Sequence, residues 1–319
     1  MKVLLAPLNW GLGHATRCVP VVRYLLEQGH EVVLASDGAA FHFLKDYFPH
    51  LRFLQAPSLE VRYAKGSCQV WAMLRQLPAL MMHAWRDYHW LKRLVESEHI
   101  DCVVSDNRFG MYAHAVKSVY ITHQLMIKMP SRLRWMEAMA HAAHQWVIKR
   151  YDECLVPDYA APTGLSGDLS HAYPLPSHAR FIGPLSRFMK MELPLPDTSY
   201  DCVVLLSGPE PHRTILEQSL LAHYAQRTEK VLLLEGRPGR EAKEKSNDKI
   251  DVRAHMSDEQ LLPYLLGAKH IVCRSGYSSI MDLAVLGLLN KATLIPTPGQ
   301  TEQEYLAVLH SKKNISITC

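Results

Sequence analysis

The sequence predicts an α/β protein made of two doubly wound, Rossmann-like domains. Its 319 residues are enough for two hydrophobic cores. Short apolar runs, typical of buried parallel strands, alternate with helical segments along the whole chain. Proline-rich sequence over residues 184–200, with few periodic apolar residues, separates two such series. We therefore expect an N-terminal domain over 1–183, a linker over 184–200 and a C-terminal domain over 201–319.

The first half begins with a strand, a turn, a helix and a second strand, the usual start of a doubly wound sheet. The apolar run Lys2–Pro7 predicts the first strand, and a helix should run from the glycine turn at 11–13 to about Gln28. The other expected strands are Glu31–Ala35, Leu51–Gln55, Cys102–Ser105, Ser118–Thr122, Glu153–Val156 and Arg180–Ile182. The other expected helices are Ala39–Tyr47, Gln69–Ser97 with a break at Pro78, Phe109–Lys117 and Ser131–Arg150.

The second half repeats this alternation. Its expected strands are Cys202–Leu206, Val231–Leu234, Val252–Ala254, His270–Cys273 and Lys291–Pro296. Its expected helices are Thr214–Gln226, Asp258–Leu266, one that opens at Gly276 and one that begins near Glu302.

The composition favours a cytoplasmic globular protein. Hydrophobic residues make up 48% and charged residues 21%, and no apolar run reaches the roughly 18 residues that a membrane span needs. The seven cysteines are scattered without a C-x-x-C pair, which indicates a reducing compartment. The net charge of +4 is too small to predict nucleic-acid binding.

Positive charge is concentrated in one segment. Residues 108–150 hold seven basic residues and one acid, Glu137. Tryptophan and basic residues together in the Ser131–Arg150 helix fit either a core-packing helix or one that lies on an anionic membrane surface. We expect an anionic, lipid-linked acceptor or peripheral contact with the inner face of the membrane.

A phosphate-binding turn is expected in the second half. A strand ends at Arg274, Ser275 and Gly276, where a helix opens, and Asp282 follows on that helix. Unfilled N–H groups and the helix dipole favour phosphate at such a turn. The next strand leads to a polar loop with Gln300. The pattern predicts a nucleotide diphosphate held by main-chain groups, with the carboxylate on the ribose.

The first turn carries a histidine at the carboxyl edge of the sheet. Gly11 and Gly13 precede His14, but Thr16 occupies the place of the third glycine of the dinucleotide fingerprint, which argues against NAD. A neutral imidazole at the start of a helix is suited to general-base catalysis. A structural histidine, hydrogen-bonded within the turn, is the alternative.

Further polar residues follow two strands of the first sheet and are candidates for the acceptor side. They are Asp106, Asn107, Arg108 and His123. Asp106 could instead cap the following helix. No set of His, Cys, Asp and Glu has the spacing of a metal site, so neither a metal nor a cofactor is expected.

The glycine–histidine turn and the block from Arg274 through Asp282 to Gln303 resemble glycosyltransferase family 28. This is the family of the bacterial undecaprenyl-diphospho-muramoylpentapeptide N-acetylglucosaminyltransferase. The resemblance implies a GT-B fold, in which two Rossmann-like domains face a central cleft. GT-B members often end with a helix that crosses back to the first domain, and the chain stops at Cys319 without an evident one.

The resemblance also implies roles for individual residues. His14 matches the base on the acceptor side, and Asp282 matches the ribose-binding glutamate. The family's paired glutamines match Gln303 and Glu304, a departure that leaves the sugar open. The other donor-binding residues implied are Gly11, Gly13, Arg187, Ser207, Gly208, Met256, Arg274, Ser275, Gly276 and Gln300.

Together these features predict an inverting, metal-independent glycosyltransferase that moves a sugar from a nucleotide diphosphate donor, most simply a UDP-sugar, to a hydroxyl acceptor. Two alternatives stay open. The segment Gly11–Cys18 also resembles the Gly-His-x-x-Arg-Cys turn of the UDP-sugar hydrolase of pseudaminic acid synthesis, in which water is the nucleophile. The chain could also bind a nucleotide-sugar without catalysis.

Overall fold

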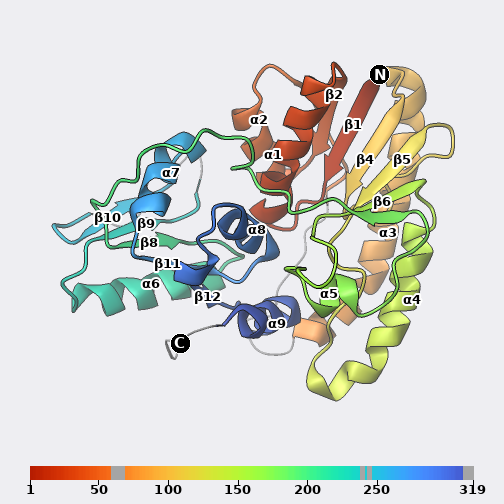
Figure 1. The fold of residues 1–319 in the computed structure, drawn as a ribbon. Coiled ribbons are helices and arrows are strands. Elements are labelled where there is room, and N and C mark those ends of the chain that lie inside the picture. The colour runs from red at the N-terminus through yellow and green to blue at the C-terminus, as the bar shows by residue number, and fades with distance from the viewer. Residues whose placement is uncertain (59–68, 238–240, 243–245, 312–319) are drawn as a thin grey trace. The chain divides into compact units, whose positions relative to one another are not determined.

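The computed structural model describes residues 1–58, 69–237, 241–242 and 246–311, apart from the side chains of residues 69–74. The chain divides into two compact units, Met1–Arg187 and Phe188–Cys319, each with its own parallel sheet (Figure 1). The division falls within the stretch 184–200. Leu185 packs on a core of the first unit, and Phe188 is buried in a core of the second.

The first sheet, in the part of the chain that the structure describes, has seven parallel strands in the order β3-β2-β1-β4-β5-β6-β7. The strands are β1 Lys2–Pro7, β2 Glu31–Ser36, β3 Arg52–Gln55, β4 Cys102–Asp106, β5 Lys117–Ile121, β6 Glu153–Val156 and β7 Ala179–Phe181. Leu4 of β1 pairs with Val33 of β2 on one side and with Val103 of β4 on the other. The direction of the connections therefore reverses between β1 and β4.

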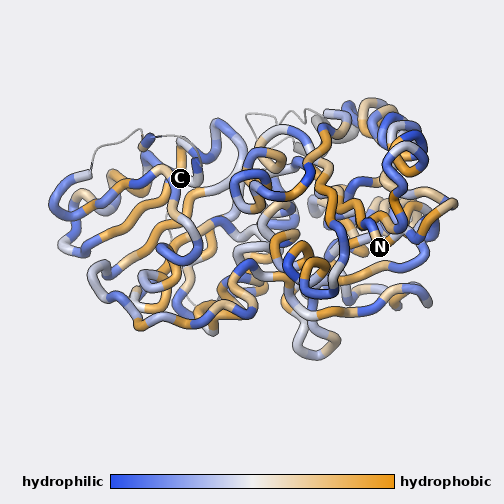
Figure 2. The backbone as a smooth tube through the Cα atoms, turned by 90° about the horizontal axis from the view of Figure 1, so that it is seen from above, coloured by the Kyte–Doolittle hydropathy of each residue, from blue (hydrophilic) through white to orange (hydrophobic). Residues whose placement is uncertain are grey.

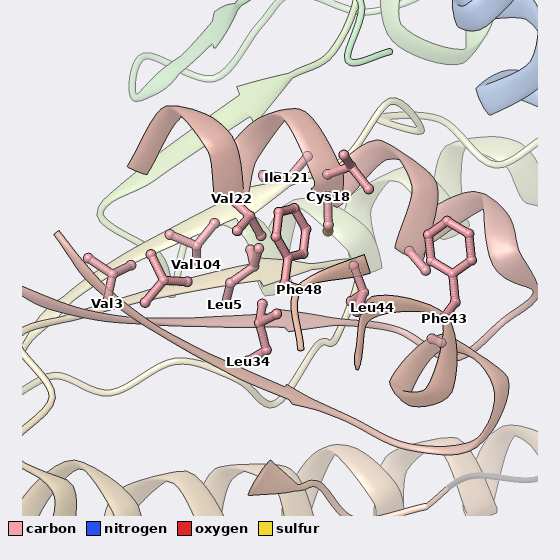
Figure 3. Close-up of a cluster of buried hydrophobic side chains, with 14 of the residues drawn as sticks. Val3, Leu5, Cys18, Val22, Leu34, Phe43, Leu44, Phe48, Val104 and Ile121 are labelled. Atoms are coloured by element: carbon pink, nitrogen blue, oxygen red, sulfur yellow. The ribbon is translucent and has the colours of Figure 1, made fainter. Parts of the chain in front are cut away.

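Helices cover both faces of this sheet. They are α1 Leu12–Glu27, α2 Gly38–Tyr47, α3 Gln69–Glu98, α4 Glu137–Ile148, α5 Asp168–His171 and the 3-10 helix η1 Ser131–Met136. Alternate residues of β1 point to opposite faces, as in any strand. Val3 and Leu5 pack with α1 and α2, whereas Leu4 and Ala6 pack with α3. Figure 3 shows the first of these cores, with Val22 of α1 lying over Leu5.

The helix predicted over Phe109–Lys117 is wrong. Residues 109–116 form turns and irregular backbone. Gly110 lies directly against α3, since a Cβ atom there would come within 1.9 Å of the main-chain oxygen of Ala84. Met111 and Ala113 are buried in the core beside α3. Packing on α3 thus holds this segment in a non-helical conformation.

Two other helices differ from the prediction in detail. The expected break at Pro78 does not occur, and α3 continues through this exposed residue. A proline removes one N–H donor and crowds the carbonyl group one turn before it, and packing of the rest of the helix can offset that cost. The helix predicted over Ser131–Arg150 begins as η1, in which Leu133 departs from helical backbone angles, and α4 starts at Glu137.

The second sheet, within the described ranges, has five parallel strands in the order β10-β9-β8-β11-β12. They are β8 Cys202–Leu205, β9 Val231–Leu234, β10 Ile250–Arg253, β11 His270–Arg274 and β12 Ala292–Ile295. The helices are α6 His212–Ala225, α7 Asp258–Gly267, α8 Tyr277–Val285, α9 Thr301–His310 and the 3-10 helix η2 Leu289–Lys291.

This sheet also has a core on each face. Helix α6 packs on one face, and α7 and α8 pack on the other. The central strands of both units are rich in apolar residues (Figure 2), as expected for parallel strands that are buried on both sides. The connections reverse between β8 and β11.

Candidate functional site

The reversal between β1 and β4 brings the predicted residues of the first unit together. In open parallel sheets, ligands bind outside the carboxyl ends of the strands where the connections change direction. The loop after β1 contains Gly11, which precedes α1 and has a φ of +85°, and Gly13 lies in the first turn of α1. His14 follows in that turn, and Asp106 is the last residue of β4.

His14 and Asp106 form a direct pair. The Nδ1 atom of His14 lies 3.0 Å from Oδ1 of Asp106. Asp106 is completely buried, whereas the His14 side chain is 15% exposed. Burial alone would raise the pKa of Asp106, but the charges of Arg17 and His14 and their hydrogen bonds hold it well below the usual range. The carboxyl group is therefore ionised throughout the physiological pH range.

Arg17 was not among the predicted site residues, although it is the arginine of the Gly-His-x-x-Arg-Cys turn. Its Nε donates to Asp106 Oδ2 at 2.6 Å, and its Nη2 donates to Asp106 Oδ1. Its Nη1 lies 2.9 Å from Nδ1 of His123, which joins this residue to the cluster. The sequence also carried a second signal. Arg17 is a charged residue three positions after His14, on a helix whose other buried residues are apolar.

The other two acceptor-side candidates lie next to Asp106 in sequence but differ in environment. Asn107 has a positive φ of 55° and accepts a hydrogen bond from the hydroxyl of Tyr120 at 3.1 Å. Arg108 is buried and forms ion pairs with Asp37 at 3.1 Å and Asp87 at 2.7 Å. Arg108 thus joins the end of β4 to α3 and to the start of α2. The pair of His14 and Asp106 is held by Arg17 instead.

The reversal between β8 and β11 organises the second unit in the same way. Gly208 follows β8 with a φ of +102°. A Cβ atom at Gly208 would lie 3.7 Å from Oγ1 of Thr297 and 4.0 Å from Nε of Arg274. Arg274 ends β11, and its guanidinium donates to the main-chain oxygens of Pro296 and His212 at 2.8 and 2.7 Å. Three loops from separate strands therefore meet at Arg274.

Two buried polar atoms in this cluster lack a hydrogen bond to the residues that the structure describes. They are Oγ1 of Thr297 and Nε2 of His212. Buried polar groups in proteins are normally paired, and an orphan atom often marks a place where a ligand or water binds. Neither residue was expected from the sequence, because neither belongs to a local motif.

The turn after β11 leaves room for a ligand at the start of α8. Gly276 precedes α8, and a Cβ atom there would meet no heavy atom within 4 Å. The Oγ of Ser275 donates to the main-chain oxygen of Gln303 at 2.7 Å, so this side chain fixes the turn. Asp282 lies further along α8 and is nearly buried. Burial, with a smaller contribution from the charge of Asp282, raises the pKa of Cys273 to about 12.

The predicted glutamines are joined at the start of α9. Nε2 of Gln303 donates to Oε1 of Gln300 at 2.6 Å, and Oε1 of Gln303 accepts from the main-chain N–H of Thr297 at 2.9 Å. Glu304 is used differently, because its carboxylate accepts from the main-chain N–H of Gly299 at 2.9 Å. These contacts attach α9 to the loop that carries Thr297.

The remaining donor candidates lie in three other places. Ser207 is exposed beside Gly208. The side chain of Met256 is buried in the core, so only its main chain could meet a ligand. Arg187 ends the first unit, where its carbonyl oxygen accepts from Nη1 of Arg23 at 2.9 Å.

Neither unit, in its described part, brings together three or more His, Cys, Asp or Glu side chains that could hold a metal ion. Of the helices formed by these residues, none combines the length and the apolar character that crossing a bilayer requires.

Known proteins resemble this chain at low sequence identity. No family model matches the chain. Two proteins of Methanosarcina acetivorans, each described as an uncharacterized glycosyltransferase, are 22% identical to it. The first alignment spans 314 residues, 95% of this chain and 80% of the relative.

Solved structures resemble the whole chain. The spinosyn rhamnosyltransferase SpnG, complexed with thymidine diphosphate, matches with a TM-score of 0.63 and 13% identity over 97% of this chain and 84% of SpnG. MurG of Acinetobacter baumannii matches with a TM-score of 0.52 and 11% identity over 97% of this chain and 82% of MurG. The chain has the GT-B fold. Both predicted Rossmann-like sheets are confirmed by this likeness and by their parallel topology.

Proposed function

We propose that the protein is a glycosyltransferase that takes a sugar from a nucleotide diphosphate, most simply a UDP-sugar, and transfers it to a hydroxyl acceptor. The observation that carries this proposal is the buried Oγ1 of Thr297 beside Gly208, at the reversal point of the second sheet, which has no hydrogen-bond partner among the described residues. Phosphate oxygens would satisfy that hydroxyl and would lie near the start of α8, where the helix dipole favours an anion. The relatives from Methanosarcina acetivorans and the complex of SpnG with thymidine diphosphate support it.

His14 supplies the base in this proposal. Its Nε2 makes no hydrogen bond to the described residues, while Nδ1 is held by Asp106. The imidazole takes the proton of the acceptor hydroxyl as its oxygen attacks the anomeric carbon. The bond from that carbon to the diphosphate breaks, and the electron pair leaves with the diphosphate. One direct displacement inverts the anomeric centre.

The second unit would stabilise the leaving group without a metal. Helix N-termini and fixed cations are suited to hold a diphosphate as its charge develops. The main-chain N–H groups after Gly276, the Thr297 hydroxyl and the guanidinium of Arg274 provide these elements. Asp282 and Gln303 remain the proposed contacts to ribose and sugar. Membership of glycosyltransferase family 28 is part of this proposal.

We propose that the acceptor is linked to a lipid in an anionic bilayer. The protein would contact this acceptor at the inner face of the membrane. Trp135, Met139 and Trp146 are all more than 60% exposed on η1 and α4. These positions are four and seven residues apart, which places them along one side of the helical segment. Arg134 and Lys149 are exposed on the same segment. Tryptophan with lysine and arginine suits the membrane interface.

One observation favours a hydrolase as the second candidate. Arg17 and Cys18, which the Gly-His-x-x-Arg-Cys turn of a UDP-sugar hydrolase contains, both contact Asp106. With water in place of the acceptor, His14 would take a proton from that water instead.

Nucleotide binding and turnover test these proposals together. Purified protein is screened by thermal shift against nucleotide diphosphates and nucleotide-sugars. A ligand at 100 times its Kd should raise the free energy of unfolding by about 2.7 kcal/mol. Release of UDP is then measured with and without hydroxyl acceptors, and with EDTA. Acceptor-dependent release that survives EDTA supports the transferase. Release without an acceptor supports the hydrolase, binding without turnover supports a sensor, and no binding refutes all three.

A further inference from the structure

Two buried carboxyl groups face each other at the carboxyl edge of the second sheet. Glu217 lies on α6 and Glu235 directly follows β9, and they are 3% and 0% exposed. Each carboxyl group has an arginine of its own. Nη1 of Arg213 donates to Oε2 of Glu217 at 2.9 Å, and Nη1 of Arg237 donates to Oε2 of Glu235 at 3.0 Å. The proposed reaction uses none of these four residues.

The second oxygen of Glu217 lacks a donor. Its Oε1 atom is buried and has no hydrogen-bond partner among the described residues. The carboxyl group of Glu235 lies within hydrogen-bonding reach of Glu217. Two ionised carboxylates side by side in a buried site would repel each other, and neither could donate. A proton held between them removes one charge and supplies the missing donor.

We propose that Glu217 and Glu235 share one proton and form a pH-sensitive contact between α6 and the loop after β9, which loosens when the proton is lost and thereby weakens donor binding. The effect on the donor rests on the proposed function, whereas the shared proton does not.

The surroundings of the pair favour the shared proton. Burial raises the pKa of Glu217; the charge of Arg213 opposes this, and the charge of Glu235 and a hydrogen bond to it raise the pKa further. In the described part of this unit, Arg213 and Arg237 are the charged groups that contact the pair. Glu210, in the loop after β8, lies 2.7 Å from Nη2 of Arg213. It takes up part of the charge of that arginine and leaves less of it for Glu217.

The pair connects the loops that follow β8 and β9. At the end of the first loop, the main-chain N–H of Arg213 donates to the oxygen of Pro209 at 3.1 Å. In the second loop, Gly236 lies against the end of β8, since a Cβ atom there would come within 2.3 Å of the main-chain oxygen of Leu206. Gly208, beside the proposed phosphate site, belongs to the first loop. Loss of the shared proton would push the two carboxylates apart and loosen both loops.

Urea unfolding of the unmodified full-length protein and of E217Q, from pH 4 to pH 8, tests the shared proton. The amide in E217Q can accept from Arg213 and donate to Glu235, as the protonated pair does. Stabilisation by a shared proton is complete below the unfolded pKa of about 4.3 and is lost as the pH rises through the folded value. We therefore expect the urea midpoint of E217Q to rise relative to that of the unmodified protein as the pH increases.

The opposite charge state gives the opposite sign. If both carboxylates are ionised and paired with their own arginines, E217Q has a deficit in stability that stays constant or grows as the pH rises. Either result overturns the proposal. E235Q can donate to Glu217 in the same way and has the same expected sign, so it decides if E217Q does not fold.

E210Q is the matched control, because it changes the exposed partner of the same arginine. Burial opposes ionisation of Glu210, but hydrogen bonds from Thr214 and Arg213 and the charge of Arg213 lower its pKa overall. Its stabilisation is present above the unfolded pKa. E210Q should therefore not gain stability relative to the unmodified protein as the pH rises, and a gain equal to that of E217Q overturns the assignment to the buried pair.

The Kd for UDP, measured by calorimetry over the same pH range, tests the effect on the donor. The Kd of the unmodified protein should rise about fivefold or more relative to that of E217Q as the pH increases, the usual scale of coupling between sites. Ionisation of UDP is the same for both proteins and cancels in the ratio. A constant ratio overturns the coupling to donor binding. If neither protein binds UDP, the proposed function is refuted, and the unfolding experiment still decides the shared proton.

Discussion

Ser275 and Gln303 are joined by a hydrogen bond of 2.7 Å from the serine Oγ to the glutamine's main-chain oxygen. Ser275 lies in the loop after β11, and Gln303 lies in the first turn of α9, which follows the adjacent strand β12. This bond fixes the start of α9 beside the turn that opens α8. The proposed phosphate turn and the proposed sugar contacts are therefore parts of one rigid arrangement within the second unit.

Gly208→Ala should weaken nucleotide binding. A methyl group there would lie 3.7 Å from Oγ1 of Thr297 and would occupy the space proposed for phosphate. We expect the Kd for UDP, measured by calorimetry, to rise about tenfold or more, the equivalent of 1.4 kcal/mol.

Gly287→Ala is the matched control for that change. Gly287 also has a positive φ, of 70°, but a Cβ atom there would meet nothing within 4 Å. Both variants should lose about 1–2 kcal/mol of stability from backbone strain, and only Gly208→Ala should lose affinity. Equal UDP affinity in the two variants would remove Gly208 from the donor site.

His14→Ala should lower turnover by roughly 10²–10⁴-fold, the usual contribution of a general base. Binding of UDP should be unchanged, because the groups proposed to hold it belong to the second unit. His50→Ala, at an exposed position, is the control and should keep full activity. Unchanged turnover in His14→Ala would exclude it as the base.

Membrane contact should depend on the exposed tryptophans. The double variant Trp135→Ala/Trp146→Ala should bind vesicles that contain phosphatidylglycerol about tenfold more weakly in a sedimentation assay, since each indole contributes buried area at the interface. Binding should also weaken as salt increases. Tyr24→Ala removes an aromatic residue of similar exposure from α1 and should have no effect. Salt-independent binding that survives the double change would contradict the proposed surface.

Arg108→Met should destabilise the protein by about 3–5 kcal/mol, because Asp37 and Asp87 would stay buried without their shared arginine. Burial already raises the pKa of Asp87. Its charged form is disfavoured in the folded state, so the loss in the free energy of unfolding should be greater at pH 8 than at pH 5.

The exposed arginine Arg52, which pairs with Glu98, gives the control. Arg52→Met should change stability by less than about 1 kcal/mol. Adding Asp87→Asn to Arg108→Met should recover part of the loss. If Arg108→Met unfolds at the same urea concentration as the unmodified protein, the buried ion pairs have no structural role.

Asp158→Asn should loosen the segment that contains α5. The carboxylate of Asp158 accepts from the main-chain N–H groups of Leu165 and Ser166 and lies 3.1 Å from Nε2 of His171. Burial opposes ionisation, but these hydrogen bonds lower the pKa of Asp158 overall. Its stabilisation is thus present above a pH of about 4, the unfolded pKa, and is lost as the pH falls through the folded value.

We expect Asp158→Asn to cost about 2–3 kcal/mol at pH 7, as for the loss of hydrogen bonds to a charged group. The difference from the unmodified protein should shrink on acidification, as followed by urea unfolding at several pH values. Asp248→Asn, at an exposed site, should be neutral. A difference that grows as the pH falls would contradict the assigned charge state.

Local patterns in the sequence predicted the strands well, because parallel strands buried on both faces appear as short apolar runs. The helix predicted over Phe109–Lys117 failed because Gly110 packs against Ala84 of α3, a contact distant in sequence. Likewise, η1 precedes α4 although the composition of Ser131–Arg150 suits one continuous helix.

By itself, the sequence determined the parallel α/β class, the break near residues 184–200 and the two turns that follow β1 and β11, since each depends on neighbouring residues. Only the tertiary structure decided which polar residues meet. It joined His14 to Asp106, 92 positions away, placed Arg17 against His123, and brought Thr297 beside Gly208. Strand order and side-chain packing set these distances, and neither is encoded in a local pattern.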